Sequence, residues 1–343
     1  MRSSGHPLPV AHWERFGRET GDLWAVLLPV RHWTRGVWSF ADAGAYDRAV
    51  TVDRSLLLST VQMAHFAASG MLSFEGIVPG DINDVAIDEL RTWGAQPFRR
   101  PTPASLTPLS QCYPAPAAIG SVLRLPAVMG IIESLVGSDP LFDHDFVHLR
   151  RPNDLIDQRL HADAILDPTM AFDIQLFYFP HAIAPGEGGT RYVPGTHLRR
   201  VNESDIARYQ NVRGQRDFSG PAGTILVFHH GLWHSGRANP SSRDRVMCKV
   251  RLNPTVTQTR LWNTDDLDAV QSGPDDHIFA RFDTTKVGHT LRIPEPWWEQ
   301  ASGRLEQRNR ALLWRYLSGD DAFDVDYYLT RTENRMRLAG AFA

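Results

Sequence analysis

The chain has few cysteines and no long apolar run. Cys112 and Cys248 are its only cysteines, so a disulfide scaffold is not expected and a reducing compartment fits better. The most apolar window, residues 117–136, is interrupted by charged residues and by Pro126, which argues against a membrane span. The amino terminus also lacks the apolar core of a signal peptide. These absences predict a cytoplasmic protein that does not enter membranes.

An excess of positive charge is missing as well. The 36 lysines and arginines against 39 acidic residues give a net charge of −3, so we expect no nucleic-acid partner. Hydrophobic residues make up 42% of the chain and charged residues 22%, which is typical of a globular protein with a sizeable core. A length of 343 residues allows one large catalytic unit.

The first part of the chain, residues 1–65, reads as a helical extension. Apolar residues recur at roughly helical spacing, and Leu56–Phe66 is a second helical segment. We expect these residues to cover the core, although they could instead roof a substrate pocket. The spaced apolar residues are Trp13, Phe16, Leu23, Trp24 and Leu27.

Three further helices are predicted. Ile82–Trp93 carries a mostly one-sided apolar stripe, with Asp81 as its expected cap. Ile119–Val136 is helical but contains Pro126, which should kink or split it. Between these two, residues 94–116 are rich in proline and read as an irregular surface loop. Leu305–Leu317 is the best helix of a carboxy-terminal helical tract, residues 257–343.

From about residue 143 the pattern changes to short β-rich runs bounded by proline, glycine, asparagine and aspartate. Such runs are typical of a sandwich or jelly roll, so the fold is expected to be mainly β with flanking helices. The runs are Phe146–Arg150, Phe172–Phe179, Thr190–Val193, Gly223–Phe228 and Arg245–Leu252.

The most informative stretch is the sequence His161-Ala-Asp163. In an extended backbone, side chains two residues apart leave the same face, so an imidazole and a carboxylate can reach one ion. A third ligand must come from elsewhere, and His234 in Trp233-His-Ser-Gly is the favoured candidate over His229 and His230. Two histidines and one carboxylate on one side of a metal are typical of non-haem Fe(II) oxygenases.

Several ordered motifs resemble the phytanoyl-CoA dioxygenase (PhyH) family of Fe(II)/2-oxoglutarate-dependent oxygenases. The resemblance covers residues 66–256, and several motifs in order are more specific than any one of them. They are Phe66–Gly70, Leu135–Gly137, His161–Asp163, Gly188–His197 and Trp233–Arg245.

This resemblance implies a double-stranded β-helix, a cupin-like jelly roll, with catalytic iron held by His161, Asp163 and His234. 2-Oxoglutarate would chelate the iron through its keto acid, leaving one position for dioxygen. Its distal carboxylate needs a cation, and the family places an arginine about a dozen residues after the second histidine. Arg245 fits this role best and Arg243 is the alternative. Within the expected strand Arg245–Leu252, the side chains of Arg245, Met247, Lys249 and Arg251 share one face, and a register error of one residue would change which side chains face the interior.

Two polar residues are weaker candidates for binding the cosubstrate. The resemblance implies that the side chain of Gln175 projects toward 2-oxoglutarate, although it could equally be a polar residue inside the barrel with no ligand. Thr190 is a weaker candidate than Gln175. Gly188 and Gly189 are expected to permit a tight turn rather than to contact a ligand.

The predicted function is a hydroxylase that acts on a C–H bond of a small organic molecule, for example a biosynthetic intermediate. The acidic ligand Asp163 argues against halogenation, while desaturation, epoxidation or ring closure stay open on the same iron. The alternatives are a non-catalytic jelly-roll binding protein and a cupin-like metallohydrolase, which would need no dicarboxylate partner. The sequence indicates neither the substrate nor the oligomeric state.

Overall fold

The computed structural model describes residues 52–95, 103–111, 117–164, 167–271, 285–298, 303–323 and 325. The chain divides into residues 1–45 and 46–343, and all of the described residues belong to the second unit. The apolar residues expected at helical spacing in residues 13–27 lie outside the described ranges, and so does Cys112. The proposed division of the chain at residues 65 and 256 stays a prediction.

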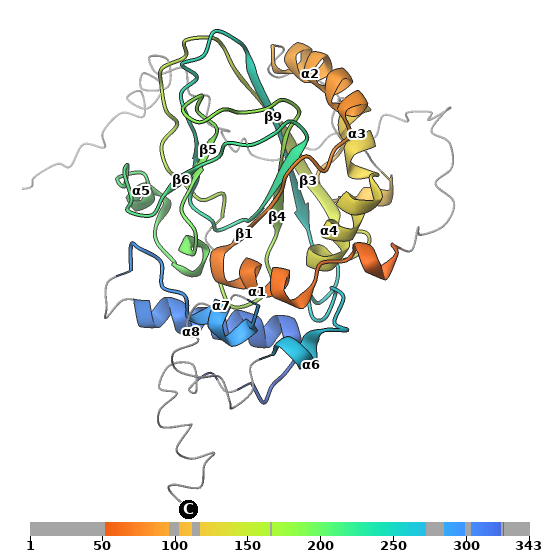
Figure 1. Cartoon of the computed structure of the whole chain (residues 1–343), viewed down its shortest axis with the longest axis vertical. Coiled ribbons are helices and arrows are strands. Elements are labelled where there is room, and N and C mark those ends of the chain that lie inside the picture. The colour runs from red at the N-terminus through yellow and green to blue at the C-terminus, as the bar shows by residue number, and fades with distance from the viewer. Residues whose placement is uncertain are drawn as a thin grey trace, which may run out of the picture. The chain divides into compact units, whose positions relative to one another are not determined.

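Two antiparallel sheets form the centre of the described structure (Figure 1). The larger contains β1 (Met71–Phe74), β7 (Thr224–His229), β4 (Ile174–Phe179), β9 (Arg245–Asn253), β3 (Leu141–Arg150) and β2 (Thr107–Pro108), in that spatial order. The smaller contains β6 (Arg216–Asp217), β5 (Thr190–Tyr192) and β8 (His234–Gly236). The mainly β fold with flanking helices is confirmed. The expected strand runs match β3, β4, β5, β7 and β9, whereas β8 and the short β2 and β6 were not predicted.

The larger sheet separates two apolar cores. Every residue of β4 is buried, because its alternate side chains enter opposite cores. Phe177 and Phe179 face the smaller sheet and pack with Tyr192 and Phe228 in an inner core. Ile174, Leu176 and Tyr178, which alternate with them along β4, face the helices in a larger outer core. The site described below lies on the inner side.

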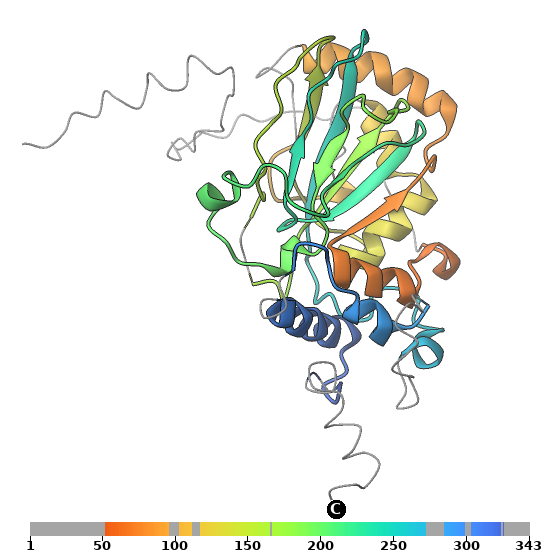
Figure 2. The same cartoon turned by 60° about the vertical axis from the view of Figure 1, so that its left-hand side comes forward.

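Helices cover the outer face and one end of this sheet (Figures 1 and 2). No helix among the described residues is long and apolar enough to cross a membrane. These covering helices are α1 (Thr60–Ser69), α2 (Gly80–Gly94), α3 (Ala117–Leu123), α4 (Pro126–Val136), α6 (Leu267–Val270), α7 (Val287–Arg292) and α8 (Gly303–Ser318). The short α5 (Glu203–Ile206) instead lies beside β6 of the smaller sheet (Figure 1).

Local sequence explains where several helices begin and end. Pro126 occupies the first turn of α4, so it splits the expected helix into α3 and α4, as one of the two predicted outcomes. The expected cap at Asp81 is wrong, since α2 begins at Gly80 after Pro79 and Asp81 lies in the first turn. An acidic side chain there still interacts favourably with the helix dipole. The predicted carboxy-terminal helix is confirmed as α8.

The end of α1 packs closely against His197. Gly70 ends this helix with a φ of 76°, and its amide donates to the carbonyl of Phe66. A methyl group at Gly70 would lie 2.5 Å from Nδ1 of His197. The glycine therefore lets two of the family-like motifs, Phe66–Gly70 and Gly188–His197, meet side by side.

Candidate metal centre

Side chains from two separate segments converge between the sheets. His161 and His234 face each other across an isolated β-bridge, with ring centroids 4.5 Å apart. Oδ1 of Asp163 lies 3.5 Å from Nε2 of His161 and 3.9 Å from Nε2 of His234. The three ligand atoms all lie within 4.8 Å of one another, and no other such group occurs among the described residues. The structure therefore brings together the three residues expected from the sequence.

Both histidines are oriented by backbone carbonyls. Nδ1 of His161 lies 2.9 Å from the carbonyl oxygen of Arg159, and Nδ1 of His234 lies 2.9 Å from that of Leu232. A carbonyl only accepts, so each Nδ1 carries the hydrogen and each Nε2 keeps its lone pair. This is the tautomer and the outer hydrogen bond that metal-binding histidines commonly have.

The charge states also suit a divalent cation. Burial lowers the pKa of His234 to about 3, so this imidazole is neutral at physiological pH. Burial alone would raise the pKa of Asp163. The side chains of His161, His234 and Lys249 around the carboxylate outweigh it and hold that pKa well below its usual range. Metal binding needs such neutral imidazoles and an ionised carboxylate.

Aromatic side chains cover the centre from the inner core. The ring of His234 lies 5.3 Å from that of Phe177 and 5.8 Å from that of Phe228. His161 and Asp163 are half-buried, whereas His234 is buried. The centre thus has a dry side against the inner core and a side that reaches solvent.

Strand β9 lines the inner face with Arg245, Met247, Lys249 and Arg251. The register places Arg245 opposite Arg150, and Arg251 opposite both Gln175 and His144. The face that these four residues were expected to share is therefore confirmed, and the pairing also fixes which end each of them occupies.

Arg245 is buried at one end of this face. Its Nη1 donates to the carbonyls of Glu187 and Ala238, and its Nη2 donates to that of Arg237. These bonds leave the Nε hydrogen and one Nη2 hydrogen for a ligand. Burial lowers the pKa of Arg245 to about 10, so the guanidinium stays charged at neutral pH.

The alternative arginine has a different setting. Arg243 donates to the carboxylate of Glu187 at 2.6 Å and to the carbonyl of Ala182 at 2.7 Å, and its side chain is 46% exposed. It precedes β9 and forms this ion pair at the surface. The structure thus favours Arg245 as the cation available to an interior ligand, although the assignment of either arginine to 2-oxoglutarate stays a prediction.

The two weaker candidates lie at opposite ends of the inner face. Thr190 is buried on β5 and pairs with Gly236, close to the loops that receive the guanidinium of Arg245. Gln175 is fully buried on β4 opposite Arg251, and its amide has no hydrogen-bond partner among the described residues. A role for either residue in binding the cosubstrate also stays a prediction.

Gly188 lets the loop before β5 pass close to Arg245. Its φ is 78°, and an added methyl group would overlap the carbonyl of Ala238 and approach Nη1 of Arg245 to 2.6 Å. The positive φ and the close approach to Ala238 agree with the expectation that Gly188 permits an unusual backbone path, whereas its lack of contact with a ligand stays a prediction. We expect Gly188→Ala to lower the free energy of unfolding by about 3 kcal/mol or more, because backbone strain and a backbone clash add.

Gly186 offers a matched control for this substitution. It has a φ of 85°, but an added methyl group would meet nothing within 4 Å. Gly186→Ala should therefore cost only the backbone strain, about 1–2 kcal/mol. Equal losses for the two variants in urea unfolding would show that the close approach at Gly188 is not important.

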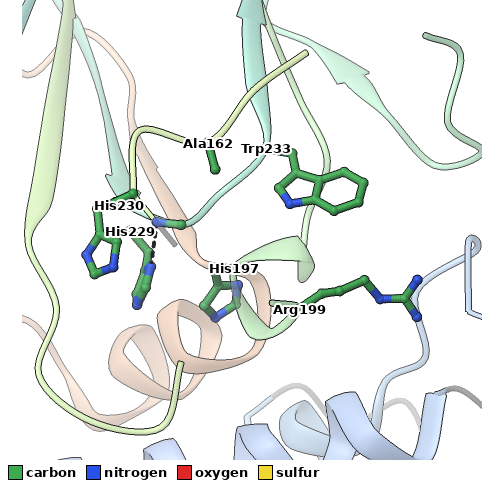
Figure 3. A pocket seen from close by; sticks show the side chains of 8 residues that line it. Ala162, His197, Arg199, His229, His230 and Trp233 are labelled. Carbon is green, nitrogen blue, oxygen red and sulfur yellow. Dashed lines mark hydrogen bonds between the residues drawn. The ribbon is translucent and has the colours of Figure 1, made fainter. Parts of the chain in front are cut away.

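Three histidines line a small hollow behind the metal centre (Figure 3). The rings of His197, His229 and His230 are tilted against one another, with centroids 4.9 and 4.4 Å apart. They lie beside Ala162, which stands between the two expected ligands of the His-Ala-Asp motif. Nδ1 of His230 accepts from the amide of Asp173, and Nδ1 of His229 accepts from that of Gly231. His229 and His230 are thus held by backbone contacts, in agreement with the preference for His234 as ligand.

This histidine cluster predicts a loss of stability in acid. Burial lowers the pKa of His197 to about 3 and that of His229 well below its usual range. The unfolded chain takes up protons at these groups below about pH 6.5, whereas the folded chain does not. Each histidine should therefore reduce the free energy of unfolding by about 1.4 kcal/mol per pH unit as the pH falls from about 6 to 4.

The test is to measure the slope of the free energy of unfolding against pH in the unsubstituted chain and in His229→Phe. Phenylalanine fits among the aromatic neighbours but binds no proton, so the slope should become shallower by about one proton. An unchanged slope would mean that His229 is protonated in the folded chain.

Two contacts of the site were not predicted from the sequence. Lys249 donates to Oδ2 of Asp163 at 2.6 Å, and Arg251 pairs with Asp173 at 2.5 Å. The alternation of β9 already placed both cations on the inner face. Their carboxylate partners come from loops of irregular backbone, which no periodic pattern reveals.

Residues 117–247 match the model of the family described as phytanoyl-CoA dioxygenase (PhyH). A search of curated protein sequences finds no match.

Several solved structures are similar over somewhat more than half of the chain. A nickel complex of the non-heme monooxygenase ThoJ is 18% identical, covering 57% of this chain and 80% of that one with a TM-score of 0.43. Apo HygX from Streptomyces hygroscopicus is 15% identical, covering 58% and 87% with a TM-score of 0.44. Apo EctD from S. alaskensis is 15% identical, covering 57% and 77% with a TM-score of 0.42. The resemblance drawn from the motifs is confirmed by the family match, in which residues 117–247 fit the model of the phytanoyl-CoA dioxygenase (PhyH) family.

Proposed function

We propose that this protein is an Fe(II)/2-oxoglutarate-dependent dioxygenase that hydroxylates, or otherwise oxidises, a C–H bond of a small organic molecule. The observation that carries the proposal is the convergence of His161, Asp163 and His234. The family match supports it, and so does the buried arginine at one end of the same face.

The donor set suits Fe(II) better than a closed structural metal site. Two imidazole nitrogens and one carboxylate on one side of an ion form the arrangement found in non-haem Fe(II) oxygenases. Both Nε2 lone pairs are free, because the Nδ1 hydrogens are donated to carbonyls. When bound, the iron and 2-oxoglutarate would supply the oxidising chemistry, which consumes dioxygen and yields succinate and carbon dioxide.

Arg245 would bind the distal carboxylate of 2-oxoglutarate. Its remaining Nε and Nη2 hydrogens suit a carboxylate, and the carbonyls of Glu187, Arg237 and Ala238 hold the rest of the guanidinium in place. Between Arg245 and the triad, β9 presents Met247, which packs in the inner core. The apolar carbons of the cosubstrate would lie against this surface.

The chain's other contributions are positioning and the exclusion of water. Phe177 and Phe228 pack beside His234 and keep the inner side of the centre dry. The half-buried His161 and Asp163 mark the side from which a substrate would approach.

Turnover of 2-oxoglutarate tests this function directly. Purified protein with Fe(II) should form succinate and consume oxygen when 2-oxoglutarate is added, and a panel of candidate small molecules should contain some that stimulate both. Zinc in place of iron should give no turnover. Hydrolytic activity with zinc and without oxygen would favour a metallohydrolase, and metal binding without any reaction would favour a non-catalytic protein.

A further inference from the structure

The two carboxylate oxygens of Asp163 face different partners. Oδ1 faces the two imidazoles, at 3.5 Å from Nε2 of His161 and 3.9 Å from Nε2 of His234. Oδ2 accepts a hydrogen bond from Nζ of Lys249 at 2.6 Å, and this distance is typical of a strong charge-assisted bond. The lysine therefore occupies the oxygen that points away from the histidines.

Strand β9 holds Lys249 in this position. Its backbone pairs with Phe146 on β3 and with Phe177 on β4, and its side chain is only 12% exposed. The neighbouring cation on the same face, Arg251, has carboxylates of its own in Asp173 and Asp143. Lys249, by contrast, donates the hydrogen bond of its ammonium to Asp163.

It is also important that the cation bound to Asp163 is a lysine and not an arginine. The chain contains only two lysines, Lys249 and Lys286, and its other 34 of 36 basic residues are arginines. An arginine here could pair with both oxygens of a carboxylate through its planar fork. A lysine ammonium is a compact point charge that can hold one oxygen and leave the other free.

We infer that Lys249 is a positioning residue that holds Oδ2 of Asp163, so that the carboxylate offers only Oδ1 to the metal. This inference rests on the proposed function. A carboxylate can also bind an ion through both oxygens. Three protein donors leave an octahedral ion three positions, which a bidentate 2-oxoglutarate and dioxygen fill completely. A second oxygen from Asp163 would take a position that the cosubstrate needs.

The affinity for metal alone does not test this role. An ammonium close to a divalent cation also repels it, so loss of Lys249 removes both a positioning bond and a repulsion, which have opposite effects on affinity. The informative quantities are how Asp163 coordinates the metal and how tightly the loaded protein binds 2-oxoglutarate.

The experiment compares the full chain with Lys249→Met, both loaded with Ni(II) for crystallography and with Fe(II) for anaerobic titration by 2-oxoglutarate. In the unsubstituted chain we expect the metal on Oδ1 and Nζ of Lys249 on Oδ2. In Lys249→Met we expect both oxygens of Asp163 on the metal, and 2-oxoglutarate bound about tenfold more weakly or worse at saturating Fe(II).

Arg251→Met is the matched control, because it removes a cation of similar exposure from the same face but not the partner of Asp163. Its affinity for 2-oxoglutarate should stay within about twofold of the unsubstituted chain, and thermal unfolding of both variants checks that they fold. An equal loss in Arg251→Met would show a general effect of charge and overturn the inference.

Two structural results would also overturn it. One is a metal-loaded chain in which Lys249 contacts 2-oxoglutarate instead of Asp163. The other is Lys249→Met with Asp163 still bound through one oxygen and unchanged cosubstrate affinity. Failure of the unsubstituted chain to bind metal is a separate result, which would remove the proposed function and this inference with it.

Discussion

Replacement of His234 by alanine is expected to leave a folded protein that neither retains Fe(II) nor turns over 2-oxoglutarate. His234 is the buried member of the triad, and its Nε2 faces Asp163 while Nδ1 is bound by the carbonyl of Leu232. Loss of an outer hydrogen-bond partner alone weakens metal sites by about 10–100-fold. Loss of a ligand should therefore weaken iron binding by more than about hundredfold. Metal content after gel filtration and succinate formation measure the two effects.

His230→Ala is the control for this variant. It removes an imidazole from the same segment whose Nδ1 accepts from a backbone amide and which belongs to the histidine cluster. This variant should retain iron, although the amide of Asp173 loses its acceptor. A folded His230→Ala without metal, or a His234→Ala that keeps it, would show that the wrong histidine has been assigned.

Arg245→Ala is expected to weaken the binding of 2-oxoglutarate by about 30- to 1000-fold, with much less effect on iron. Truncation of one partner of a buried charge pair costs about 2–4 kcal/mol, and every 1.4 kcal/mol is tenfold in affinity. The metal ligands keep their own contacts, since the guanidinium bonds only to Glu187, Arg237 and Ala238 among the described residues. Anaerobic titration of the iron-loaded variant with 2-oxoglutarate gives the change.

Arg243→Ala separates the two candidate arginines. Its side chain is bound to Glu187 at the surface, so we expect the affinity for 2-oxoglutarate to change by less than about threefold, as for an exposed ion pair. The opposite ranking of the two variants would mean that the guanidinium of Arg243 reaches the interior in the loaded protein. Arg245→Lys adds a finer comparison, because it keeps the charge but loses the planar fork.

The sequence predicted the elements that follow a regular period. The β-rich runs became strands because alternation and flanking turn residues act locally, and Pro126 split a helix because it lacks an amide hydrogen. The cap of α2 was wrong by two residues, since helix starts depend on the tertiary setting of the preceding turn. Strand β8 was missed because its three residues, His234-Ser-Gly, include no β-branched side chain and no apolar alternation.

The candidate site, too, has parts that the sequence predicts and parts that it does not. The triad could be predicted because His161 and Asp163 lie two residues apart, and because His234 follows a recognisable motif. The contact of Lys249 with Asp163 could not, because 86 residues separate them and the pairing of β9 with β3 and β4 decides which cations face the metal. The hydrogen-bond acceptors of the Arg245 guanidinium could not be predicted either, because they are backbone carbonyls, which any sequence can supply.

The most direct test of the account is an anaerobic titration of the purified chain with Fe(II), followed by 2-oxoglutarate, monitored in the visible range. We predict one iron per chain and a charge-transfer band that appears only when both components are present. Asp163→Ala should abolish the band, because it removes the carboxylate that faces both imidazoles. A folded chain that binds no iron, or a band that survives in Asp163→Ala, would contradict the assignment of these three residues to one metal.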